Sequence, residues 1–166
     1  MNFILSLAAA VVIHELGHIF AARLVRVPLV SVGQKLTGLS LVFDFSHVGF
    51  FAEEFVHSGG AVFGIISAFA AALTNARSLY AFTGISLTLA AVNLLPLSSF
   101  DGGAILSSIL SAFFLPDTVW RITKTVSAVT LVILWTSVLW TELRVGANLG
   151  LIVFVCGIMI YLTEKT

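Results

Sequence analysis

Charged side chains are scarce in this sequence. Only 10% of its 166 residues are Asp, Glu, Lys or Arg, while 59% are hydrophobic, whereas a soluble domain carries about 25% charged residues. One soluble core of this size could not hide so much apolar surface, so lipid must cover most of it. The composition therefore excludes an ordinary soluble protein and indicates a polytopic membrane protein.

Other features are also missing. Eight basic residues balance eight acidic ones without any Lys/Arg cluster, so we expect no nucleic-acid partner. The single cysteine, Cys156, excludes an intramolecular disulfide. Residues 1–13 resemble the apolar part of a signal peptide, but they lack a basic start. They lead directly into His14, so we expect an uncleaved first span.

Long apolar runs predict five membrane spans. The runs cover residues 2–25, 57–74, 79–97, 119–141 and 146–163, each long enough to cross roughly 30 Å of hydrocarbon. Asn93, Pro96 and the segment Asp101-Gly102-Gly103 interrupt the third run, and a further apolar piece covers 104–115. We therefore expect a broken helix there rather than one continuous rod.

Residues 28–52 have a different pattern, with a proline and three glycines separating short runs of strand-forming residues. Within 39–45, Leu and Phe alternate with Ser, Val and Asp, which predicts a β-hairpin. Bare strand edges cannot face lipid, so the hairpin must lie at the membrane interface or dip inward where protein or water satisfies its backbone. The fold class is all-α polytopic, with about five transmembrane helices, this small hairpin and one broken helix.

Basic residues predict the orientation in the membrane. With five spans, one side carries Arg23, Arg26, Lys35, Arg121, Lys124 and Lys165, and the other only Arg77 and Arg144. The positive-inside rule places the richer side, and the hairpin, in the cytoplasm. The N-terminus would then lie outside and the C-terminus inside.

The segment His14-Glu15-Leu16-Gly17-His18 carries the clearest chemistry. Two histidines four residues apart lie on one helical face, where both can bind one metal ion. Glu15 is rotated by about 100° from His14, which lets it act on a water at the metal. The alternative is a set of polar residues satisfied inside a helix bundle, but each costs about 2–3 kcal/mol near mid-bilayer and normally marks function.

A catalytic zinc usually has three protein ligands, so the two histidines need a third ligand from elsewhere in the chain. Most other carboxylates lie in the hairpin, at span ends or in the tail. Asp101 instead lies at a helix break inside apolar sequence, where side chains can converge on an ion. Asp101 is therefore the best third ligand, for one Zn²⁺ per chain.

The histidine segment, together with the later segment Asn93-Leu94-Leu95-Pro96-Leu97-Ser98-Ser99-Phe100-Asp101-Gly102-Gly103, resembles the site-2 protease family of intramembrane metalloproteases, particularly its sporulation-type bacterial branch. The resemblance implies that His14, His18 and Asp101 bind zinc and that Glu15 is the general base. It also implies that Asn93, Pro96 and Gly102 hold the substrate strand or shape the site. Ser58-Gly59-Gly60 partly matches the family's glycine-rich segment, and Ala104 replaces a frequent arginine.

The resemblance implies a single membrane-embedded protease domain, residues 1–166, with a catalytic core in 1–115 and two additional helices in 116–166. Its substrates would be transmembrane or membrane-proximal segments of other proteins, cleaved on the cytoplasmic side, with a separate membrane protein as regulatory partner. An edge of the hairpin, in residues 28–45, could pair with the unwound substrate, or the hairpin could be purely structural.

Two other kinds of protein remain open. One is a non-proteolytic membrane protein that binds or transports zinc, although the far halves of the spans offer few polar groups for a path. The other is an inactive scaffold derived from such an enzyme, which would be expected to lose Glu15 or a ligand. His47 and His57 are isolated histidines without a partner at ligand spacing, and we expect no metal at either.

Overall fold

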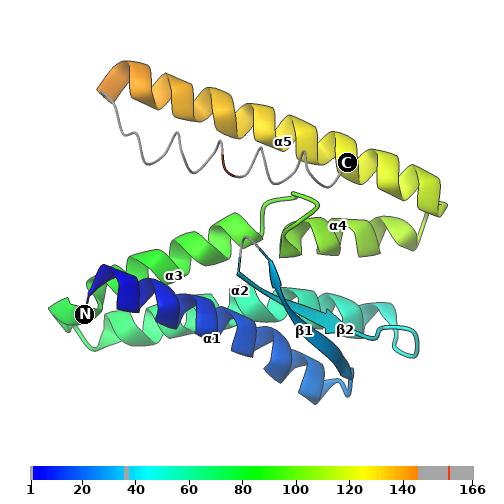
Figure 1. Cartoon of the computed structure of the whole chain (residues 1–166), viewed down its shortest axis with the longest axis horizontal. Helices are drawn as coiled ribbons and strands as arrows, with labels where there is room; N and C mark the ends of the chain where they lie inside the picture. Colours follow the sequence, from blue (N-terminus) through cyan, green and yellow to red (C-terminus); the bar gives the residue numbers. More distant parts are fainter. Residues whose placement is uncertain (1, 36–37, 146–156, 158–166) are drawn as a thin grey trace. The chain divides into compact units, whose positions relative to one another are not determined.

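A computed structural model describes residues 2–35, 38–145 and 157, and Figure 1 draws the chain. The chain forms two compact units, Met1–Leu95 and Pro96–Thr166. Five α-helices, one short 3₁₀ turn and a two-stranded antiparallel sheet make up the described residues. The expected fold class, mostly helical with a small hairpin and one broken helix, is confirmed.

The first unit contains three helices that contact one another: α1 (Phe3–Leu24), α2 (Phe50–Leu73) and α3 (Tyr80–Asn93), the last preceded by the 3₁₀ turn η1 (Arg77–Leu79). Helix α1 buries a stripe of small residues and histidines, while Phe3, Ile4 and Leu24 are more than half exposed. This pattern suits a bilayer, where small residues let helices approach and large apolar residues face lipid.

Helices α1 and α2 cross at two glycines. A Cβ atom placed on Gly17 would collide with the Gly59 carbonyl oxygen, and one on Gly59 would lie 2.7 Å from the Gly17 carbonyl oxygen. Only glycine lets the two backbones come this close. Farther along, Ala10, Ala71 and Phe82 join the three helices in one apolar cluster.

The hairpin comprises β1 (Leu29–Lys35) and β2 (Gly38–Phe43), which pair antiparallel from Leu29 opposite Phe43 to Lys35 opposite Gly38. Phe43 and Phe45 pack against a buried cluster formed by Ala22, Val27 and Val56, which ties the hairpin to one end of α1 and α2. Beyond β2, Ser46 donates hydrogen bonds from its hydroxyl (2.6 Å) and its amide (2.9 Å) to Asp44 Oδ1. These bonds lower the pKa of Asp44.

The second unit contains α4 (Asp101–Ser111) and α5 (Pro116–Val145), which run antiparallel and contact each other as a helical hairpin (Figure 1). Helix α5 begins with a proline. Proline suits this first position because the first N–H of a helix has no partner within the helix and because the fixed φ of proline is close to the helical value. Before α4, the segment 94–100 contains a turn in which the Phe100 amide donates to the Leu97 carbonyl at 2.9 Å.

Three described helices are long and apolar enough to cross a membrane: Phe3–Leu24, Phe50–Leu73 and Pro116–Glu142. The run expected at 79–97 instead forms the 14-residue helix α3, which ends at Asn93 before the predicted break. Helix α2 begins seven residues earlier than the expected 57, because Glu53 and Glu54 suit the positive end of a helix dipole. The span expected at 146–163 lies outside the described residues, apart from Gly157.

Candidate metal centre

Helix α1 holds both histidines on its buried face. His14 is 5% exposed and His18 is 7% exposed, and one helical turn separates them. Their rings meet edge to face, with centroids 5.0 Å apart and an interplanar angle of 80°. The two Nε2 atoms are 3.3 Å apart. The i, i+4 spacing therefore does bring two nitrogen donors together, as expected.

The distance between these nitrogens fits a zinc ion. Two ligand nitrogens at 2.0–2.1 Å from one zinc, separated by a tetrahedral angle, stand about 3.3 Å apart. The observed Nε2 to Nε2 distance is 3.3 Å. The pair thus fits as two of the four ligands without any rearrangement of the side chains.

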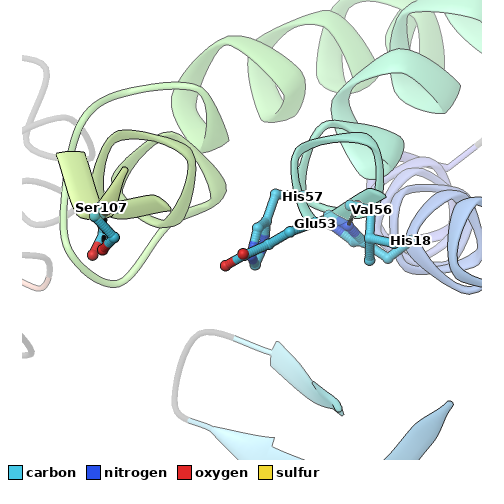
Figure 2. A network of polar contacts seen from close by, with 6 residues as sticks. His18, Glu53, Val56, His57 and Ser107 are labelled. Atoms are coloured by element: carbon cyan, nitrogen blue, oxygen red, sulfur yellow. Dashed lines mark hydrogen bonds and ion pairs between the residues drawn. The ribbon is translucent and has the colours of Figure 1, made fainter. Parts of the chain in front are cut away.

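A carbonyl on the neighbouring helix fixes the tautomer of His18. Nδ1 of His18 lies 2.8 Å from the carbonyl oxygen of Val56, and Figure 2 shows the two residues together. A carbonyl oxygen can only accept, so Nδ1 carries the hydrogen and Nε2 keeps its lone pair. Such an outer hydrogen bond both orients a ligating histidine and strengthens it as a donor.

Gly60 of α2 lies directly against the two imidazole rings. A Cβ atom at this position would collide with His18 Nε2 and would lie 2.7 Å from both Cε1 and Nε2 of His14. The two glycines of α2 therefore have different roles, because Gly59 admits the backbone of α1 and Gly60 admits the imidazoles. Helix α2 thus supplies both the carbonyl that orients His18 and the space that the rings occupy.

Glu15 follows His14 on α1 and is partly buried. Its position on the helix is about 100° from His14, so it belongs to an adjacent face rather than to the imidazole face. Its expected role, to act on a water beside the metal rather than to bind the metal, stays a prediction.

Asp101 is the first residue of α4, in the second unit, and is partly buried. Phe100 before it is extended, with φ of −114° and ψ of 168°, so the helix begins at the carboxylate itself. The dipole of α4 favours a negative charge at this end. Gly102 and Gly103 are buried directly after it, and a Cβ at Gly103 would collide with the Leu97 carbonyl oxygen.

A serine on α5 holds the segment that precedes Asp101. The Ser98 amide donates to Ser127 Oγ at 2.9 Å, and Ser127 Oγ lies 3.2 Å from the Pro96 carbonyl oxygen. Leu97, between them, is fully buried. The segment is therefore anchored to α5, and Pro96 takes part through its carbonyl group.

Asn93 ends α3, where its side-chain amide donates to the Leu89 carbonyl at 3.0 Å. This bond is directed back along α3, to a carbonyl group that lies one turn earlier. Its expected role in holding a substrate strand stays a prediction.

The expectation that neither His47 nor His57 binds a metal stays a prediction. His57 Nε2 lies 3.8 Å from Glu53 Oε1, one turn earlier on α2 (Figure 2), and the His57 ring packs on Phe45 with centroids 5.1 Å apart.

Two groups that hold the proposed ligands in place could not be predicted from the sequence. The Val56 carbonyl leaves no signal, because every residue has one. Ser127 lies on a helix that the sequence described only as an additional span. Gly60 was noticed as part of a glycine-rich segment, but its contact with the rings depends on how α1 and α2 cross.

Comparison with known proteins identifies the family. The sequence profile of peptidase family M50 matches residues 47–136, more than half of the chain. The chain belongs to peptidase family M50. This confirms the resemblance to site-2 proteases, while the sporulation-type branch stays a prediction. The region matched to the M50 profile contains Asn93, Pro96 and Asp101, and His14 to His18 precede it.

The fold agrees with membership of the M50 family. The structure of the Site-2 Protease from Methanocaldococcus jannaschii matches with a TM-score of 0.72 and 22% sequence identity. The match covers 96% of this chain and 75% of that one. Among curated protein sequences there is no significant match. By family this chain is a peptidase, and its fold resembles that of a site-2 protease.

Proposed function

We propose that this chain is a zinc endopeptidase that cleaves peptide bonds in or beside transmembrane segments of other membrane proteins. His14, His18 and Asp101 would bind one zinc ion. The observation that carries the proposal is the pair of buried Nε2 atoms 3.3 Å apart on α1. Two nitrogen donors at this separation match two positions of a tetrahedral zinc site.

The donor set also suits the charge of the ion. Two neutral imidazoles and one carboxylate leave a single positive charge on the site when Zn²⁺ is bound, which reduces the cost of a buried charge. The position of Asp101, at the start of α4 and beside a helix break inside an apolar sequence, supports its assignment as the third ligand. The bound ion would supply Lewis acidity, which polarises a peptide carbonyl and lowers the pKa of a water molecule.

Glu15 would move the proton. In hydrolysis, a water oxygen bonds to the carbonyl carbon while the C–N bond breaks. The carboxylate of Glu15 accepts the proton that the water loses and delivers it to the leaving amine nitrogen. Its partial burial beside the imidazole face suits a carboxylate that faces both the ion and the substrate.

The hairpin would present the substrate. A helical substrate hides its amides in intrahelical hydrogen bonds, so cleavage needs local unwinding into an extended strand. In the described part of the chain β1 and β2 pair only with each other, which leaves the outer edges of the sheet open to a further strand. Val30 and Val32 of β1 are 64% and 58% exposed. A substrate strand that pairs with β1 would therefore find apolar side chains beside it.

The excess of basic residues supports an orientation with the hairpin in the cytoplasm, and we propose that the site opens toward that side. Substrates would then be cut near their cytoplasmic ends. A separate membrane protein would supply regulation and part of the specificity.

The test compares Glu15→Gln with the native chain. Each is purified, mixed with candidate single-span membrane proteins, and analysed for fragments and for bound zinc. We expect Glu15→Gln to abolish cleavage and to keep about one zinc per chain. The matched control is Glu53→Gln, the same change at a carboxylate that pairs with His57, and it should cleave normally.

Two results would contradict the proposal. Undiminished cleavage by Glu15→Gln would remove the assigned proton carrier. Zinc binding by the native chain without cleavage of any candidate, and with zinc flux across vesicles, would indicate transport instead.

A further inference from the structure

A groove lies within the second unit, between α4 and α5. Its volume is about 610 Å³. Serine residues of α4 and of the segment before it line one wall, and the first turns of α5 line the other. The hydroxyl-bearing residues of the lining are Ser98, Ser99, Ser107, Ser111 and Thr123. Five of the twelve lining residues carry a hydroxyl group, so the groove offers polar groups to a ligand.

The groove is separate from the proposed metal ligand of this unit. Gly103, Ala104, Ser107 and Ser111 line it from α4, and Asp101 does not. At 100° per residue, Asp101 lies about a quarter turn away from the centre of that face. An occupant of the groove would therefore not need to touch Asp101.

One cation stands at the groove. Lys124 lines it, and its Nζ atom lies 4.9 Å from the centre of the Trp120 ring, which also lines it. No aspartate or glutamate is among the described residues that line the groove. Asp117 and Arg121 are exposed on α5 and do not line the groove. The groove therefore carries about one net positive charge and suits a ligand with a single negative charge.

Aromatic residues give the depth of the groove in the membrane. Trp120 and Trp140 lie twenty residues apart on α5, which is about 30 Å along a helix and equals the thickness of the hydrocarbon core. Each ring holds a cation four residues later, Lys124 at 4.9 Å and Arg144 at 4.8 Å. Paired rings and cations at both ends of one apolar helix are typical of the two membrane interfaces. The groove at Trp120 would then lie at the level of the lipid headgroups.

Thr123 adds an unused donor. It is 7% exposed, and within the described residues its hydroxyl oxygen has no hydrogen-bond partner. A buried hydroxyl without a partner costs about 1–3 kcal/mol. Threonine in a helix adopts two χ1 rotamers, and rotation between them exchanges the hydroxyl and the methyl group. An acceptor in the groove would therefore provide the missing bond.

We propose that this groove binds the headgroup of an anionic phospholipid. The phosphodiester carries one negative charge, which Lys124 would balance, and its oxygens would accept hydrogen bonds from the hydroxyl groups of Thr123 and Ser107. Phe114, Pro116 and Val119 line the groove as well and would contact the glycerol and the first acyl carbons. The lipid would thus bridge α4 and α5 and stabilise the helical hairpin that carries Asp101.

The experiment titrates the purified full chain in detergent with dioleoylphosphatidylglycerol and counts bound lipid by native mass spectrometry. We expect one preferred site, at which phosphatidylcholine binds at least tenfold more weakly. Lys124→Gln should lower the affinity for phosphatidylglycerol about tenfold, and Thr123→Val about threefold. Arg144→Gln is the matched control, because it removes the same kind of cation–ring pair at the other end of α5, away from the groove.

Several results would overturn the proposal. Equal binding of the two lipids would remove charge recognition, and an equal loss in Arg144→Gln and Lys124→Gln would indicate a general interface effect. Displacement of the lipid by inorganic phosphate at similar concentration would assign the groove to free phosphate. Displacement by a single-span substrate peptide would assign it to the substrate. Size-exclusion elution of each variant at the native volume confirms that a lost affinity does not reflect misfolding.

Discussion

Replacing Gly60 by alanine should damage the metal centre without changing any ligand. The added Cβ would lie 2.7 Å from two atoms of the His14 ring and would collide with His18 Nε2, whereas ordinary contacts begin at 3.4 Å. The His14 ring must therefore move by about 0.7 Å, the difference between these two distances, and the His18 ring must move farther. Metal–ligand distances tolerate only about 0.2 Å, so the alanine variant cannot keep the present geometry.

The size of the effect follows from the cost of overpacking. One extra carbon in a tightly packed site costs about 1–3 kcal/mol. If that cost falls on the zinc-bound state, zinc affinity decreases about 5- to 140-fold. The measurement is a competition titration of the purified chain against a chelator of known affinity.

Gly64→Ala is the control. It is the same substitution on the same helix and at a buried position, but its nearest neighbours, Ala90 Cβ and the Ser86 carbonyl oxygen, would both lie at 3.6 Å. It should leave zinc affinity unchanged and stabilise α2 slightly. Unchanged zinc affinity in Gly60→Ala, or an equal loss in Gly64→Ala, would refute the role of Gly60.

Four further predictions concern single residues or the metal. Asp101→Asn should lower zinc affinity at least tenfold, because a neutral amide replaces the carboxylate, and equilibrium dialysis measures it; native affinity would remove Asp101 from the ligand set. Ser127→Ala should weaken zinc binding several-fold by releasing the Ser98 amide, and Ser127→Thr should restore it, whereas a purely structural role would lower only the unfolding temperature. His57→Ala should leave zinc stoichiometry unchanged, and a lost zinc ion would show that His57 is a ligand. Chelation should stop cleavage, and added zinc should restore it; cleavage that continues without metal would contradict a zinc enzyme.

Local sequence explains most of the helices and strands. Continuous apolar runs predict α1, α2 and α5 because each helix satisfies its own backbone in lipid. The alternation in 39–45 predicts β2 because side chains of a strand alternate between faces. The break after Asn93 follows from the fixed φ of Pro96 and the missing N–H there. Helix ends were less predictable, as the early start of α2 illustrates, since hydrophobicity alone ignores the acidic residues of a first turn.

The sequence by itself determined which residues are proposed to carry the chemistry. A spacing of four residues on a helix fixes the relation between His14 and His18, and no other part of the chain is needed to bring their nitrogens together. The family could be identified for the same reason, since its motifs are local strings of residues.

Only the tertiary structure decided how that pair is held. The Val56 carbonyl sets the tautomer of His18, Gly60 leaves room for both rings, and Ser127 anchors the segment before Asp101. These partners lie 29 to 46 positions away along the chain. Their contacts depend on where two helices cross, which is set by the close packing of small residues and leaves no periodic trace in the sequence.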